Sequence, residues 1–180
     1  MTRWLAVLAA ALLLASPAWA ELAPGAQAPD FSAPASLAGK PFTFSLAEAL
    51  KKGPVVLYFY PKAFTKGCTV EAHNFSEATA EFEAQGATVI GISTDDIETL
   101  NRFSVTECRN KFAVASDADH KIMTAYDAKM TLMPGMASRT SYVILPDHSI
   151  AYVYSNLSPD QHVTNTLAAV KTWRTKQGVH

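Results

Sequence analysis

The sequence predicts an α/β protein, and three observations carry this prediction. Two apolar runs, 55–60 and 87–93, indicate buried strands, because each is short, rich in Val, Ile or aromatic residues, and preceded by Gly or Pro. A segment of helical composition, 69–85, lies between them. A predicted hairpin and a closing helix follow further on. Strands that alternate with helices are typical of an α/β sheet.

The residues before the first of these runs predict few regular elements. Gly and Pro residues scattered through 22–37 interrupt any helix, so an extended lead-in with one short strand is expected there. A turn and a short strand are expected over 39–44. Ser45 is then expected to cap a brief helix, 46–51.

The middle of the chain continues the alternation. Gly86 is expected to end the long helix that precedes the second run. Thr94 or Asp95 is expected to cap a further helix, which would carry Cys108. A short strand is expected at 112–115.

The last third predicts a short helix, a hairpin and a closing helix. The short helix is expected at 120–126 and the two strands of the hairpin at 140–145 and 150–154. Ser158 and Pro159 are expected to start the closing helix, whose apolar residues recur at helical spacing. No linker divides the chain.

Residues 1–20 predict a secretory signal peptide. A basic start at Arg3 precedes an apolar run over 4–15, and Ala18-Trp19-Ala20 is a small-x-small cleavage site. The run is shorter than the roughly 20 residues that a membrane-spanning helix needs, so cleavage is expected rather than a retained anchor. We therefore expect one exported domain, 21–180, that is located in the periplasm and has no membrane contact after cleavage.

The composition argues against nucleic acid and metal as partners. The 15 basic and 16 acidic residues give a formal charge of −1, and the basic residues form no stripe. The histidines show no ligand spacing and are expected at the surface or bonded to a partner, so no metal site is predicted. These residues are His73, His120, His148, His162 and His180.

Cys68 is the strongest candidate for a catalytic nucleophile. It lies where the strand of 55–60 gives way to a helix. A thiol at the start of a helix faces unpaired N–H groups and the positive end of the helix dipole, which favour the thiolate and make the sulfur a better nucleophile.

The residues around Cys68 resemble a known signature. Pro61-x-x-x-Thr65-x-x-Cys68 resembles the active-site motif of the peroxiredoxins, and the longer stretch 60–72 resembles their Q-type branch, which is like bacterioferritin comigratory protein. The resemblance covers nearly all of 22–175. It implies a thioredoxin-like fold with a mixed central sheet and helices on both faces. It also implies a thiol-dependent peroxidase that reduces hydrogen peroxide and organic hydroperoxides without metal, haem or flavin.

The resemblance also implies roles for individual residues. Cys68 would be the peroxidatic nucleophile, oxidised to sulfenic acid. The Thr65 hydroxyl would orient the peroxide, and Pro61 would shield the thiolate from water. Arg139, directly before a predicted strand, would stabilise the thiolate and donate to the peroxide.

Two further residues belong to the expected peroxide site. Glu71 is expected in the first turn of the Cys68 helix, where a carboxylate suits the helix dipole, and it is a candidate partner for Arg139. Gly67 is expected to help form the turn, and the backbone N–H groups of Gly67 and Cys68 are candidates to line the site.

Cys108 is the candidate resolving cysteine. Many relatives carry that cysteine five positions after the first, where this chain has His73, and others carry it near the position of Cys108. If Cys108 resolves, an intramolecular disulfide forms, which a thioredoxin-like dithiol reductant of unknown identity must reduce. A disulfide needs Cα atoms about 4.4–6.8 Å apart. Two cysteines on separate helices are not expected to lie that close in the reduced fold, so the first turn of the Cys68 helix would have to unwind.

Alternatives remain open at this point. The enzyme could use one cysteine, with an external thiol resolving Cys68 and Cys108 serving as a small buried residue. A non-catalytic binding domain stapled by a structural Cys68–Cys108 disulfide is a second alternative. A thioredoxin-like disulfide exchanger is disfavoured because Cys-x-x-Cys is absent. Monomer and homodimer are both open.

Overall fold

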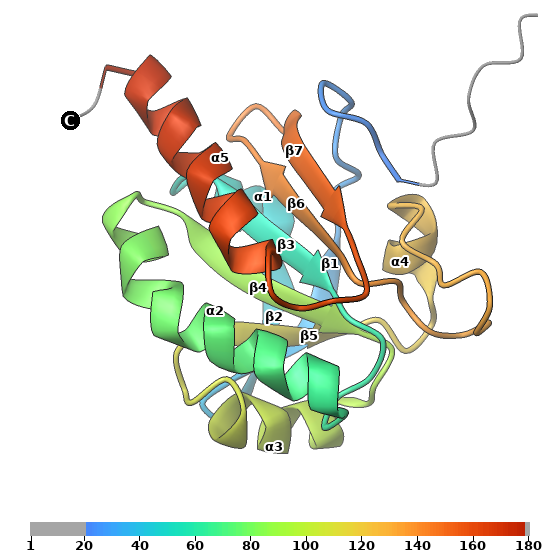
Figure 1. The fold of residues 1–180 in the computed structure, drawn as a ribbon. Helices are drawn as coiled ribbons and strands as arrows, with labels where there is room; N and C mark the ends of the chain where they lie inside the picture. The colour runs from blue at the N-terminus through green and yellow to red at the C-terminus, as the bar shows by residue number, and fades with distance from the viewer. Residues whose placement is uncertain (1–20, 179–180) are drawn as a thin grey trace, which may run out of the picture.

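The computed structural model describes residues 21–178, and a seven-stranded sheet runs through its centre (Figure 1). The strand order is β2-β1-β5-β4-β3-β6-β7. The strands are β1 (Ser32–Leu37), β2 (Lys40–Ser45), β3 (Val55–Phe59), β4 (Thr88–Ser93), β5 (Ala113–Ser116), β6 (Thr140–Ile144) and β7 (Ile150–Ser155).

The sheet is mixed. Strands β3, β4 and β5 pair in parallel, whereas β1, β2, β6 and β7 add antiparallel pairs. The close pairing of β3 and β4 depends on Gly91, which stands opposite Tyr58. A Cβ at Gly91 would lie 2.7 Å from the Tyr58 ring, so the glycine makes room for that ring.

Five helices of the described chain cover the two faces of the sheet (Figure 1). Buried side chains of α2, α3 and α5 form one core cluster with the sheet, and those of α1 and α4 form a second on the opposite face. The helices are α1 (Leu46–Leu50), α2 (Lys66–Ala84), α3 (Ile97–Thr106), α4 (Lys121–Ala125) and α5 (His162–Lys176). The predicted α/β class, with helices on both faces of a mixed sheet, is confirmed.

Aromatic stacking fixes helix α2, which carries Cys68, and helix α3, which precedes Cys108. Phe75 of α2 stacks on Tyr58 with ring centroids 4.4 Å apart, and Phe103 of α3 stacks on Tyr60 at 5.5 Å. All four rings are almost fully buried. Each buried phenylalanine contributes about 1.5–3 kcal/mol, so α2 and α3 are held firmly beside the end of β3.

Several predicted local features are confirmed. The Ser45 side chain caps α1 by accepting from the Glu48 N–H at 3.4 Å. Gly86 follows α2 with φ +72°, a left-handed conformation that ends the helix. Both hairpin strands occur within a residue of their predicted bounds.

Two predicted helix starts were wrong. The long helix begins at Lys66 rather than near 69, which places Cys68 in its first turn and Glu71 beyond it. The N-cap of α3 is Asp96, which accepts from the Thr99 N–H at 2.7 Å. Asp95 instead accepts from the Ala63 N–H at 2.7 Å, and this contact holds the loop after β3.

Two further predictions about helix ends were wrong. Cys108 does not lie on a helix, because α3 ends at Thr106 and the left-handed residues Arg109 (φ 51°) and Asn110 (φ 61°) turn the chain away. Helix α5 begins at His162 rather than at Ser158, since Ser158 bonds to Asn156 and Asp160 in a local turn.

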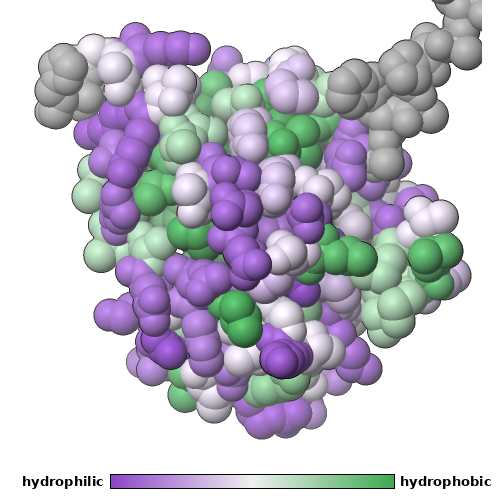
Figure 2. Space-filling view, viewed as in Figure 1, coloured by the Kyte–Doolittle hydropathy of each residue, from purple (hydrophilic) through white to green (hydrophobic). Residues whose placement is uncertain are grey.

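The surface includes an exposed apolar loop. It lies between α4 and β6, where Leu132 is 91% exposed and Met133 48%, and Figure 2 shows hydrophobic residues gathered on that side of the molecule. Within 21–178, no helix combines the length and hydropathy needed to cross a membrane. The predicted signal peptide, 1–20, lies outside the described residues.

Candidate active site

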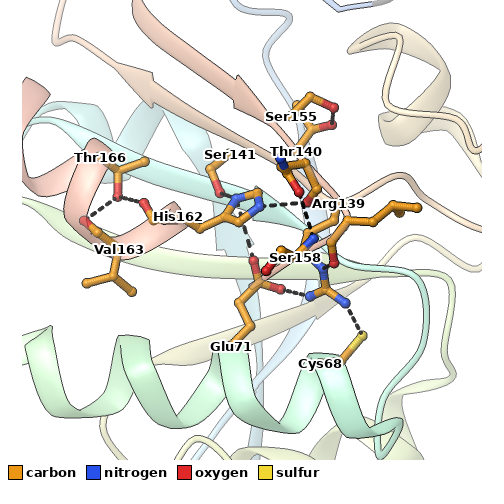
Figure 3. A network of polar contacts seen from close by, with 12 residues as sticks. Cys68, Glu71, Arg139, Thr140, Ser141, Ser155, Ser158, His162, Val163 and Thr166 are labelled. Atoms are coloured by element: carbon orange, nitrogen blue, oxygen red, sulfur yellow. Dashed lines mark hydrogen bonds and ion pairs between the residues drawn. The ribbon is translucent and has the colours of Figure 1, made fainter. Parts of the chain in front are cut away.

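Cys68 lies in the first turn of α2, directly after the loop that leaves β3. Its side chain is 1% exposed, and its thiol is free. Arg139, from the residue before β6, points its Nη2 at the sulfur from 3.4 Å (Figure 3). The sheet brings them together because β3, which leads to α2, pairs with β6.

The start of α2 offers unpaired backbone donors beside the sulfur. The first backbone bond of the helix runs from the Thr69 N–H to the Thr65 carbonyl at 2.9 Å. The N–H groups of Gly67 and Cys68 precede it and have no acceptor among residues 21–178. Gly67 thus lies inside the helix rather than in a turn before it. The Thr65 hydroxyl donates to the Lys62 carbonyl at 2.9 Å, which leaves its oxygen able to accept.

The guanidinium of Arg139 is held in three directions. Nε donates to the Leu157 carbonyl at 2.9 Å, Nη1 donates to Glu71 Oε2, and Nη2 faces Cys68. The side chain is nearly buried. Burial opposes its charge, but Glu71 and Cys68 together raise the pKa of Arg139, so the cation persists. The predicted Glu71–Arg139 pair is confirmed.

The reason given for Glu71 from the sequence was wrong. Glu71 lies past the first turn of α2 and is fully buried, so its setting is the core rather than the exposed end of a helix. Burial raises the pKa of Glu71 to about 8, although Arg139 acts to lower it. Its second oxygen, Oε1, has no hydrogen-bond partner among the described residues.

Two functional candidates, His162 and Ser141, did not stand out in the sequence. His162 at the start of α5 is fully buried; its Nδ1 lies 2.8 Å from Ser141 Oγ and 3.6 Å from Glu71 Oε1 (Figure 3). Ser141 is a polar residue inside the buried strand β6. The Ser141 hydroxyl within an otherwise apolar run was the one sequence signal that could have indicated a polar contact there. Nothing in the sequence around His162 indicated a functional role.

Comparison with known proteins identifies the family. Residues 24–153 match the model of the AhpC/TSA family, which is well over half of the chain. The solved structure of the peroxidoxin BcpB from Mycobacterium tuberculosis is 32% identical and superposes with a TM-score of 0.75, covering 83% of this chain and 96% of that one. The chain belongs to the peroxiredoxin family.

Two further peroxiredoxins are similar to it. Peroxiredoxin Q of Xanthomonas campestris has a TM-score of 0.68 at 27% identity, covering 78% of this chain and 90% of that one. Chloroplastic peroxiredoxin Q of Triticum aestivum is 34% identical over 72% of this chain, which spans 59% of the wheat protein. The predicted thioredoxin-like peroxiredoxin fold is confirmed, and the family is one of peroxidase oxidoreductases.

The remaining residues of the peroxiredoxin signature lie close by in the chain. Pro61 is half-buried in the loop after β3, beside Ala63, which Asp95 holds. The shielding role of Pro61 stays a prediction, as does the role of Thr65. Among residues 21–178 there is no cluster of His, Cys, Asp and Glu that could hold a metal ion.

Cys108 is a free thiol that is fully buried in the same core cluster as Cys68. Burial raises the pKa of Cys108 far above its ordinary value, and the charge of Glu107 adds to this effect. In this arrangement Cys108 is protonated at neutral pH and a poor nucleophile. Its use in peroxiredoxin chemistry therefore requires that its segment open.

Proposed function

We propose that this protein is an exported thiol-dependent peroxidase that reduces hydrogen peroxide and organic hydroperoxides. The observation that carries the proposal is the contact of Arg139 Nη2 with Cys68 Sγ at 3.4 Å, beside the unpaired N–H groups at the start of α2. A permanent cation and these N–H groups favour the thiolate and can donate to both oxygens of a bound peroxide.

The first step is an in-line displacement at oxygen. The Cys68 thiolate attacks one peroxide oxygen, an S–O bond forms, and the O–O bond breaks. Sulfur loses two electrons and becomes sulfenic acid, while the departing oxygen takes up a proton and leaves as water or an alcohol. Arg139 and the backbone donors stabilise the charge that builds on the departing oxygen.

The second step resolves the sulfenic acid. Cys108 attacks Cys68 sulfur, an S–S bond forms, and the S–O bond breaks with release of water. A dithiol donor then returns two electrons and two protons and restores both thiols. Since Cys108 is buried and protonated, the segment around it and the first turn of α2 must both open.

Peroxide consumption with excess dithiothreitol tests this proposal. We expect the wild type to turn over, Cys68→Ser to be inactive, and Cys108→Ser to retain activity because dithiothreitol resolves Cys68 directly. Mass spectrometry under non-reducing conditions should find a Cys68–Cys108 bond only after peroxide is added.

Two outcomes would redirect the proposal. Turnover by the wild type without any Cys68–Cys108 bond would make the protein a one-cysteine peroxidase, an alternative that the deep burial of Cys108 supports. No peroxide consumption, together with a disulfide that forms regardless of peroxide, would make it a stapled binding domain.

Export is supported by the sequence of residues 1–20, with its basic start, apolar run and Ala18-Trp19-Ala20 site. We expect the native protein in the periplasm with a mature N-terminus at Glu21. Cell fractionation and N-terminal mass analysis check this, and a chain that retains Met1 in the cytoplasm would overturn it.

A further inference from the structure

The buried cluster around Cys68 has more potential negative charge than positive charge. Arg139 is permanently charged, whereas the Cys68 thiolate and Glu71 would each carry a negative charge. Their exposed fractions are 5%, 1% and 0%. If Cys68 and Glu71 were both ionised, one negative charge would remain uncompensated away from water, which is strongly unfavourable. One additional proton would neutralise the cluster.

The contact between Glu71 and His162 offers a place for that proton. Within residues 21–178, Glu71 Oε1 accepts no hydrogen bond, and His162 Nδ1 faces it from 3.6 Å. The opposite ring nitrogen, Nε2, lies 2.9 Å from the Asn156 carbonyl. A carbonyl oxygen only accepts, so Nε2 carries a hydrogen, and Nδ1 is the nitrogen that gains or loses a proton.

Ser141 allows Nδ1 to exist in both forms. Its hydroxyl lies 2.8 Å from Nδ1 and can donate to the bare nitrogen or, after rotation, accept from the protonated one. The imidazole itself cannot swing away, because Asn156 holds its other edge and Tyr154 packs against it with centroids 4.8 Å apart.

We propose that Glu71 and His162 share one proton, which balances the charge of the Cys68 thiolate, and that His162 is a positioning residue for the Glu71–Arg139–Cys68 chain of contacts. The inference rests on the proposed role of Cys68 as nucleophile. It assigns His162 a function through Glu71 and Arg139 rather than through contact with the peroxide.

The surroundings agree with a single shared proton. Burial raises the pKa of Glu71 to about 8. Burial lowers the pKa of His162; the bond to the Asn156 carbonyl opposes this shift, and the charge of Arg139 adds to it. The charged or titratable groups around the pair are Arg139 and, from β7, Tyr154. Burial raises the pKa of Tyr58 of β3, and the charge of Glu71 is among the smaller causes, so Tyr58 stays neutral.

A double-mutant cycle tests the proposal in a Cys108→Ser background, where Cys68 is the remaining thiol. The readout is the pH midpoint of Cys68 ionisation, followed by the ultraviolet absorbance of the thiolate. We expect His162→Gln to raise this midpoint by about one pH unit, a tenfold change in thiolate population. In a Glu71→Gln background, which has no second anion to balance, His162→Gln should have no further effect.

Thr166→Val is the matched control. The Thr166 hydroxyl donates to the backbone carbonyl of His162 at 2.6 Å, so its loss disturbs the helix but leaves the imidazole unchanged. Its midpoint should match the parent. An unshifted midpoint in His162→Gln, or an equal shift with and without Glu71, would show a merely structural role and overturn the proposal.

A reciprocal measurement needs no change at His162. If the negative charge of the Cys68 thiolate favours binding of the shared proton, linkage requires that the Glu71–His162 pair bind this proton less tightly once the sulfur is removed. We expect the NMR titration of the His162 ring to move to lower pH in Cys68→Ser. An identical titration of the His162 ring with and without the Cys68 sulfur would contradict the proposal. Neither readout uses peroxide, so failure here is distinguishable from failure of the peroxidase proposal.

Discussion

At the scale of single residues, the proposed chemistry of Cys68 depends on the position of the Arg139 guanidinium, whose Nη2 lies 3.4 Å from the sulfur. Gly67 is the residue that leaves room for it, because a Cβ at Gly67 would lie 3.0 Å from Arg139 Nη2. That distance is closer than ordinary contact, so a side chain at this position pushes the guanidinium away from the sulfur.

Gly67→Ala should therefore separate activity from stability. We expect peroxide reduction to slow by about tenfold, equivalent to about 1.4 kcal/mol of barrier. Stability should stay level or rise by up to about 1 kcal/mol, since alanine is the better helix former. Peroxide kinetics and urea unfolding measure the two effects. Lys66→Ala, an exposed change in the same turn, is the control, and equal rates in both variants would show that the guanidinium adapts freely.

At the scale of elements, the segment that carries Cys108 is fastened to α2. His73 Nε2 pairs with Glu107 at 2.9 Å, and Arg109 pairs with Glu77 at 3.1 Å. The segment is neither helix nor strand and is held at its core by the buried Cys108 side chain. Partly exposed side-chain pairs of this kind contribute about 0.2–1 kcal/mol each, so these two contacts hold the segment weakly enough for it to open.

Alkylation of Cys108 in Cys68→Ser should report this opening. We expect the native protein to react far more slowly than the unfolded chain, because the thiol is buried and protonated. His73→Ala should speed the reaction about two- to fivefold by removing the contact of His73 with Glu107. Lys171→Ala, which removes an exposed pair with Glu81 elsewhere on α2, should change nothing. Alkylation as fast in the native protein as in the unfolded chain would refute the closed state.

At the scale of the whole molecule, Glu71 links the active site to the stability of the fold. Its pKa is raised from 4.5 to about 8, so the folded state holds a proton that the unfolded chain releases. The contribution of Glu71 to stability is therefore fully present at low pH and is lost as the pH rises through this window.

We expect the unfolding free energy of the reduced wild type, relative to Glu71→Gln, to fall between about pH 5 and about pH 8. The slope of this difference should approach one proton, or about 1.4 kcal/mol per pH unit. Urea unfolding across this range measures it. The pKa of Asp117 is also raised by burial, but that effect is common to both proteins and cancels. A difference that rises with pH would contradict a raised pKa at Glu71.

The sequence by itself determined the α/β class, most of the strands and the place of Cys68 after β3. These features rest on neighbours along the chain: short apolar runs, Gly and Pro at their ends, and the cap at Ser45. Helix ends were less predictable. Thr94 or Asp95 was the expected cap of α3, but the side chain that caps the helix is that of Asp96, one residue further on.

The tertiary structure alone decided the setting of Glu71, His162 and Cys108. Glu71 and Arg139 are 68 residues apart, and Ser141 and His162 are 21 apart. No local sequence pattern predicts that α2, β6 and α5 meet at one buried point. Burial there is what turns a helix carboxylate and an ordinary histidine into a coupled pair, because charges removed from water must be balanced by whatever the fold brings beside them.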